Sequence, residues 1–142
     1  MSPALTTLYS FCAQPNCADG AFPFGTLVQA TNGKFYGTTF GDEFVSSCSG
    51  SDCGTVFSVA VGLRTFVGTL PTSGKAGAAV KILGNYLTGA TEVSFHGAAA
   101  KFTVVSSTEI QTSVPSGATT GLVAVKLPSG TLSSNVLFRV IP

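Results

Sequence analysis

Four cysteines are the residues in this chain best suited to covalent or metal chemistry, and they form two pairs with the same spacing. Cys12 and Cys17 enclose four residues, as do Cys48 and Cys53. Disulfides across these two turns would pin the loops and would require an oxidising compartment. The alternatives are free thiols or a four-cysteine zinc site, although zinc knuckles more often have a two-residue spacing. We expect a disulfide within each pair, while four cysteines permit three connectivities.

Candidate general acids, general bases and metal ligands are few. The single histidine, His96, lies in the turn-like run FHGAAA, which offers neither an orienting carboxylate nor a nucleophile. Asp42 and Glu43 follow a predicted strand, but the alternating oxygen ligands of a calcium loop are missing. We therefore expect no catalytic residue, no metal and no cofactor. The enzyme alternative is a weak hydrolase with a pocket at an oligomer interface, lined by Asp42, Glu43, Tyr36 or His96.

Aromatic side chains are the remaining candidates for ligand binding. Tyr9, Phe35 and Tyr36 lie in predicted strands or hairpins, where alternation places some of them outside a core. Exposed aromatic rings beside acidic residues such as Asp42 and Glu43 suit stacking on a carbohydrate. A lectin-like glycan-binding module is therefore one alternative. The favoured interpretation is that these rings pack neighbouring modules together.

The composition limits the partners. Hydrophobic residues make up 44% and charged residues 9% of the chain, against about 25% charged residues in ordinary soluble domains. Such a weakly charged surface hints at self-association, and the net charge of +1 argues against nucleic acid. No apolar run approaches the roughly 20 residues that span a bilayer, so we expect no membrane insertion. The N-terminal residues show no signal peptide.

The spacing of apolar residues predicts an all-β chain of two modules. Helical periodicity is nearly absent, whereas strand-like segments recur about every ten residues between Gly, Pro and Asn. All four cysteines and ten of the fourteen aromatic residues precede residue 70, and residues 68–77 are rich in Gly, Pro, Ser and Thr. We expect a first module at residues 1–68, a linker at 69–77 and a second module at 78–142.

Four strands are expected in the first module, near residues 5–11, 26–31, 34–40 and 54–60. The Asn32-Gly33 pair predicts a tight type I′ hairpin, because both central residues of that turn need positive φ. The run LTTLYSF at the first of these strands is echoed by LRTFV at 63–67, which indicates an internal repeat.

The runs DGAFPFGTLVQATNGKFYGTTFGDE and CGTVFSV resemble the GloVer-type tandem repeat of exported bacterial surface proteins, over about residues 5–67. This resemblance implies a four-stranded blade of a propeller-like array. The run Phe40-Gly41-Asp42-Glu43 departs from the repeat, which usually continues with a Gly-rich loop.

Six or seven short alternating strands are expected over residues 76–142, in a small Greek-key sandwich. The order and spacing of glycines and apolar residues, among them Gly84, Phe95, Gly97 and Phe138, resemble an IPT/TIG domain. That resemblance implies an immunoglobulin-like fold. In exported bacterial proteins such domains usually act as spacers or interaction modules.

A lone blade leaves both faces and both edges of its sheet unsatisfied, which propellers avoid by radial packing. We therefore expect several copies to associate through the blade into a propeller-like homo-oligomer, for example by exchanging the strand at residues 5–11. The expected function is a non-catalytic structural or interaction module. The parent would be a longer exported protein, extracellular or at the cell surface, with a glycan as a possible partner.

Overall fold

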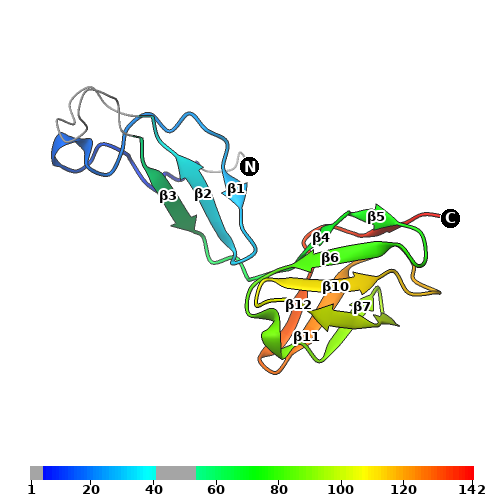
Figure 1. Cartoon of the computed structure of the whole chain (residues 1–142). Helices are drawn as coiled ribbons and strands as arrows, with labels where there is room; N and C mark the ends of the chain where they lie inside the picture. Colours follow the sequence, from blue (N-terminus) through cyan, green and yellow to red (C-terminus); the bar gives the residue numbers. More distant parts are fainter. Residues whose placement is uncertain (1–4, 41–53) are drawn as a thin grey trace. The chain divides into compact units, whose positions relative to one another are not determined.

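The computed structural model describes residues 5–40 and 54–142, and these residues are almost entirely β-structure (Figure 1). They fall into two compact units. The first unit contains the residues up to Ala30 together with Lys34–Ala60, and the second contains Thr31–Gly33 and Val61–Pro142. The all-β prediction is confirmed. The helices in the described residues are short 3-10 turns, and none has the length and apolar character needed to cross a bilayer.

The first unit is built on a three-stranded antiparallel sheet. Its strands are β1 (Val28–Gln29), β2 (Lys34–Thr38) and β3 (Val56–Ala60), in the order β1-β2-β3. A 3-10 turn, η1 (Pro15–Cys17), precedes the sheet in the chain. Because β2 is the central strand, β1 and β3 are both edges of this sheet.

The FYGTT run forms most of β2, and the GTVF run leads into its pairing partner β3. Gly37 lies opposite Phe57 in the strand register. A Cβ at Gly37 would lie 2.6 Å from the Phe57 ring and 2.7 Å from a Leu27 methyl group, so these side chains occupy the space that only glycine leaves free. Beyond β2, the Thr39 Oγ1 accepts a hydrogen bond of 2.9 Å from the Thr55 backbone N–H. The two runs are therefore the two sides of one interstrand contact.

Two details of the first unit differ from the sequence prediction. Residues 5–11 were expected to form a fourth strand, but they pair with no strand in the described part of the chain. The hairpin at Asn32-Gly33 forms, with the Ala30 N–H donating to the Lys34 carbonyl at 2.9 Å. Only Gly33 has positive φ, +81°, so the turn is not type I′. A left-handed residue at the end of a three-residue connection is the common alternative.

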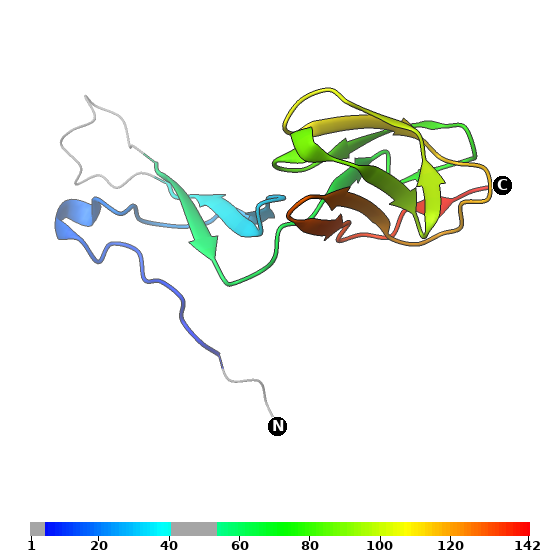
Figure 2. The ribbon, with the colours of Figure 1, turned by 90° about the horizontal axis from the view of Figure 1, so that it is seen from below.

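The second unit is a β-sandwich (Figure 2). One sheet has the order β4-β6-β10-β9, the other has the order β12-β11-β7-β8, and β13 pairs with β5 in parallel. A 3-10 turn, η2 (Leu87–Gly89), links β6 to β7. The strands of the sandwich are β4 (Gly68–Leu70), β5 (Ser73–Gly74), β6 (Ala79–Leu83), β7 (Glu92–Phe95), β8 (Ala98–Ala100), β9 (Phe102–Val104), β10 (Glu109–Ser113), β11 (Val123–Leu127), β12 (Gly130–Ser133) and β13 (Arg139–Val140).

The hydrophobic core of the sandwich lies between its two sheets. Alternate residues of β6 and β11 point inward, as the strict period of two requires. Phe95 and Phe138 meet edge to face, with ring centroids 5.1 Å apart. The twelve buried residues of the core are Val67, Val80, Ile82, Leu87, Val93, Phe95, Ile110, Val114, Val123, Val125, Leu127 and Phe138.

The segment expected to be a linker, residues 69–77, takes part in the sandwich. The end of β4 pairs with β6, and β5 pairs with β13. Gly, Pro, Ser and Thr predict loops by composition, yet each can enter a short edge strand where a neighbouring strand supplies hydrogen bonds. Val67, just before β4, is fully buried in the core. The sandwich therefore begins earlier in the chain than the sequence suggested.

Candidate functional site

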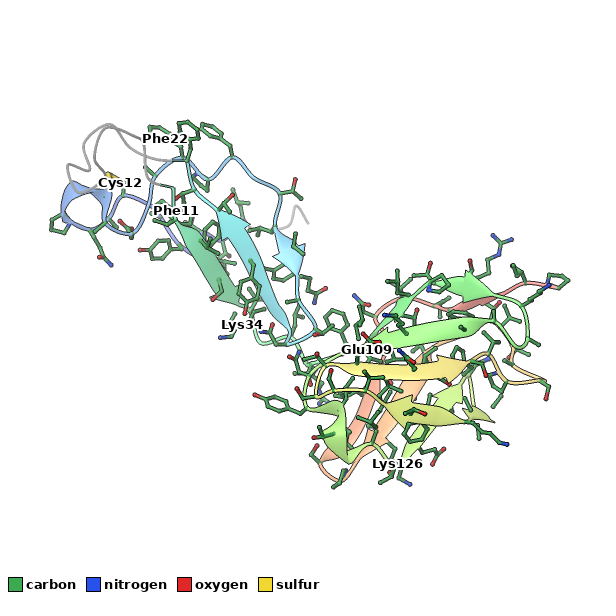
Figure 3. The ribbon with its side chains drawn as sticks, viewed as in Figure 1. Phe11, Cys12, Phe22, Lys34, Glu109 and Lys126 are labelled. Atoms are coloured by element: carbon green, nitrogen blue, oxygen red, sulfur yellow. A yellow bond between two sulfur atoms is a disulfide. The ribbon has the colours of Figure 1, made fainter. Side chains whose placement is uncertain are left out.

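The first cysteine pair closes a small loop in the first unit. Cys12 and Cys17 form a disulfide, as predicted, and the Cys12 label marks this loop beside η1 (Figure 3). Both cysteines have positive φ, +59° and +48°, a region that non-glycine residues seldom occupy. The expected disulfide between Cys48 and Cys53 lies outside the described residues. Among residues 5–40 and 54–142, no group of three or more His, Cys, Asp or Glu could hold a metal.

Asp19 organises this disulfide loop through its carboxylate. It accepts hydrogen bonds from the Tyr9 hydroxyl at 2.7 Å and from the backbone N–H groups of Ala13 at 3.1 Å and Gln14 at 3.2 Å. The loop closes through the Cys12 N–H, which donates to the Gly20 carbonyl at 2.9 Å. These hydrogen bonds therefore hold the loop between Cys12 and Gly20 in one conformation.

The Tyr9–Asp19 hydrogen bond affects the pKa of both groups. It raises the pKa of Tyr9 above its ordinary 10.0, with smaller contributions from desolvation and from the Asp19 charge. The same bond, together with the backbone N–H groups of Ala13 and Gln14, lowers the pKa of Asp19 below its ordinary 3.8. Tyr9 is therefore protonated and Asp19 ionised across the neutral pH range.

Aromatic rings surround this loop. Tyr9 contacts Phe11 edge to face at a centroid distance of 5.1 Å, and Phe11 contacts Phe57 in the same way at 4.7 Å. Phe22 and Phe24 form a parallel pair, with centroids 5.9 Å apart and an interplanar angle of 5°. Figure 3 shows Phe11 and Phe22 among the side chains of the first unit.

Two open hollows adjoin these rings. One, of about 310 Å³, is lined by Tyr9, Phe11 and Asp19 together with the side of β3. The other, of about 590 Å³, is lined by Tyr9 and Phe11 with the disulfide loop and the segment from Ala21 to Phe24. Tyr9, predicted as a ligand-binding residue, therefore lies beside both hollows.

The other predicted ligand-binding residues lie elsewhere. Phe35 and Tyr36 are half-buried on β2, opposite Val59 and Ser58 of β3. Neither lines the two hollows beside Tyr9. Asp42 and Glu43 lie outside the described residues. Of the three predicted residues that the structure describes, Tyr9 lines the two hollows, whereas Phe35 and Tyr36 do not.

His96 lies in a tight turn of the sandwich. It and Gly97 form the two-residue connection between β7 and β8, and both have positive φ, +46° and +90°, as a type I′ turn requires. The His96 Nδ1 is 2.8 Å from the Thr119 hydroxyl, and its ring lies where a side chain at position 121 would extend from Gly121. The prediction that His96 is a turn residue is confirmed.

An exposed ion pair lies on the sandwich. Lys81 Nζ is 3.2 Å from Glu109 Oε1, and the two residues lie on the adjacent strands β6 and β10. Hydrogen bonds from Gln111 first, and from Lys81 second, lower the pKa of Glu109. An exposed pair of this kind is worth little in stability and has no nucleophile beside it.

Comparison with known families accounts for the second unit. The IPT/TIG domain family matches residues 65–140, which is more than half of the chain. The chain belongs to the IPT/TIG family. Its ten-stranded second unit, with the core between two sheets, is the immunoglobulin-like part of the fold. A comparison with curated proteins found no match.

IPT/TIG domains are generally non-catalytic interaction or structural modules. The family match begins at residue 65, so it covers β4 and β5 and agrees with their place in the sandwich. The hollows beside Tyr9 lie before the IPT/TIG domain, in a part of the chain that the match leaves unassigned.

Sequence reasoning missed four residues of the aromatic loop. Phe11, Asp19, Phe22 and Phe24 were not predicted as ligand-binding residues, although all four are exposed or half-exposed and line the hollows. The run Phe22-Pro23-Phe24 could have indicated the two phenylalanines, because proline restricts the backbone between them and favours a turn. Asp19 could not be found this way, since its role depends on which N–H groups the disulfide loop brings together.

Proposed function

We propose that this protein is a non-catalytic interaction module of an exported surface or matrix protein, and that its first unit assembles with other copies of the chain. The observation that carries the proposal is the distribution of buried residues. All twelve residues of the hydrophobic core belong to the IPT/TIG domain. In the described part of the first unit, Ala21 is the one buried hydrophobic residue.

The first unit instead presents apolar side chains to solvent. On β3, Val56 is 78% exposed, while Phe57 and Val59 on the opposite face are only half-buried. The large hydrophobic residues exposed in the described part of this unit are Leu5, Leu8, Tyr9, Phe22, Phe24, Leu27, Val28, Phe40 and Val56. These exposed apolar side chains support the proposal, since contiguous exposed apolar patches often form interaction surfaces.

The sheet edge supports the same proposal. β3 has the sequence VFSVA, without charge or proline, at the edge of its sheet. Monomeric proteins normally protect such an edge with lysine, proline or a covering element. A second copy of the first unit would cover this edge and the exposed Val56 side chain on the same strand, as blades do in a propeller.

Light scattering coupled to size-exclusion chromatography tests this proposal. We expect the chain to elute above its monomer mass of 14.3 kDa. Val56→Lys should shift the protein toward the monomer, because a charge would have to be buried against the neighbouring copy. The matched control is Val105→Lys, which changes a 53% exposed valine of the IPT/TIG domain and should leave the mass unchanged. A wild-type protein that is monomeric at all concentrations contradicts the proposal.

A further inference from the structure

Phe22 and Phe24 form an exposed aromatic platform in the first unit, with one ring stacked against the other. Their rings are parallel to within 5°, and Phe22 is 53% and Phe24 83% exposed. Phe22 has a φ of +54°, which is unfavourable for a bulky residue. Its carbonyl accepts hydrogen bonds from the Phe24 N–H at 2.9 Å and the Phe40 N–H at 3.1 Å. The backbone is therefore held in a costly conformation that leaves two large rings in solvent.

The hollow of about 590 Å³ beside this platform is aromatic and uncharged. Among the described residues, its lining includes Tyr9, Phe11 and the two platform rings, and no charged side chain. Its volume is in the range of about 300–1,000 Å³ that is typical of ligand pockets. A hollow lined in this way suits a neutral ligand with flat apolar faces.

The Tyr9–Asp19 pair supplies polar groups at the same place. Tyr9 and Phe11 line both hollows, and Asp19 lines the smaller one. Since the Tyr9 hydroxyl donates its proton to Asp19, its oxygen keeps lone pairs that can accept a hydrogen bond from a ligand. The disulfide and the backbone hydrogen bonds of the loop fix this pair before any ligand arrives. Such preorganisation lowers the entropy cost of binding.

We propose that these hollows bind a neutral polysaccharide. The flat C–H face of a sugar ring would lie on the outer face of the stacked Phe22–Phe24 pair, and the hydroxyl groups of the sugar would bond to Tyr9 and Asp19. Stacking on aromatic rings, with a few oriented hydrogen bonds, gives a sugar both affinity and orientation. The proposal goes beyond the assembly role and does not depend on it.

Binding of the full chain to microcrystalline cellulose and to chitin tests the site, with cellohexaose and chitohexaose as soluble probes in calorimetry. We expect binding to at least one of these polymers, and about tenfold weaker binding by Phe24→Ala, because one stacking ring is lost. Tyr9→Phe keeps the ring and should also weaken binding, because the ordered hydroxyl is lost. The matched control is Phe40→Ala: Phe40 is 62% exposed in the same unit and lines neither hollow.

Three results would overturn the site. The first is no binding of the wild-type protein to either polymer. The second is equal weakening by Phe24→Ala and Phe40→Ala, which would indicate a non-specific apolar surface. The third is a fall in oligomer mass with Phe24→Ala, which would assign the platform to the contact between copies. Conversely, weaker binding by Phe24→Ala with an unchanged oligomer mass supports the site. If Val56→Lys loses self-association but still binds the polymer, the binding site is separate from the contact between copies.

Discussion

Asp19 shows how one side chain can order an exposed loop. Its carboxylate joins the Tyr9 hydroxyl to two backbone N–H groups of the disulfide loop. Because the fold lowers the pKa of Asp19, these bonds stabilise the loop above pH 3.8 and are lost as pH falls through the lowered value. Because the fold raises the pKa of Tyr9, that contribution is present below pH 10.0 and is lost as pH rises through the raised value.

Asp19→Asn should lower the pKa of Tyr9 back toward 10.0, because the charged acceptor is removed. The measurement is the tyrosinate ultraviolet absorbance as a function of pH, in the wild type and the variant. Tyr9→Phe identifies which of the three tyrosine titrations belongs to Tyr9. An identical set of titrations in wild type and Asp19→Asn would show that the bond is absent in solution.

Secondary-structure elements were predictable where a local pattern decides them. The period-two alternation of β6 and β11 points their apolar residues inward, and His96-Gly97 forms the expected turn. The segment at residues 69–77 was not predictable, because β4 and β5 depend on partners distant in the sequence. Residues 5–11 have the composition of a strand but pair with no strand in the described chain, although Phe11 contacts Phe57 of β3. Composition shows whether a segment is able to form a strand, and pairing with distant segments decides whether the strand forms.

Phe138→Ala should destabilise the sandwich by about 3–5 kcal/mol, because it leaves a cavity beside Phe95 where no water can compensate. Urea unfolding followed by circular dichroism measures the change. The control is Val136→Ala, two residues earlier and 55% exposed, which should change stability by no more than about 0.5 kcal/mol. Equal effects of the two substitutions would argue against the core described here.

At the scale of the whole molecule, the two units differ in how many hydrophobic residues each buries. The IPT/TIG domain has its own core and two hydrogen-bonded sheets. In its described part, the first unit has an exposed sheet edge, exposed aromatic rings and one buried hydrophobic residue. The sequence predicted this asymmetry from the repeat-like character of the first module. The aromatic hollows required the structure, because the disulfide loop brings together residues that no linear pattern links.

The molar mass of the chain in solution, compared with that of residues 61–142 alone, tests the central claim most directly. Since the IPT/TIG domain contains the whole core, residues 61–142 should fold cooperatively and remain monomeric. The full chain should form a defined oligomer by light scattering, because the first unit has exposed apolar side chains and an uncharged edge strand but contributes no residue to the hydrophobic core. A monomeric full chain, or an isolated domain that assembles as the full chain does, would contradict this account.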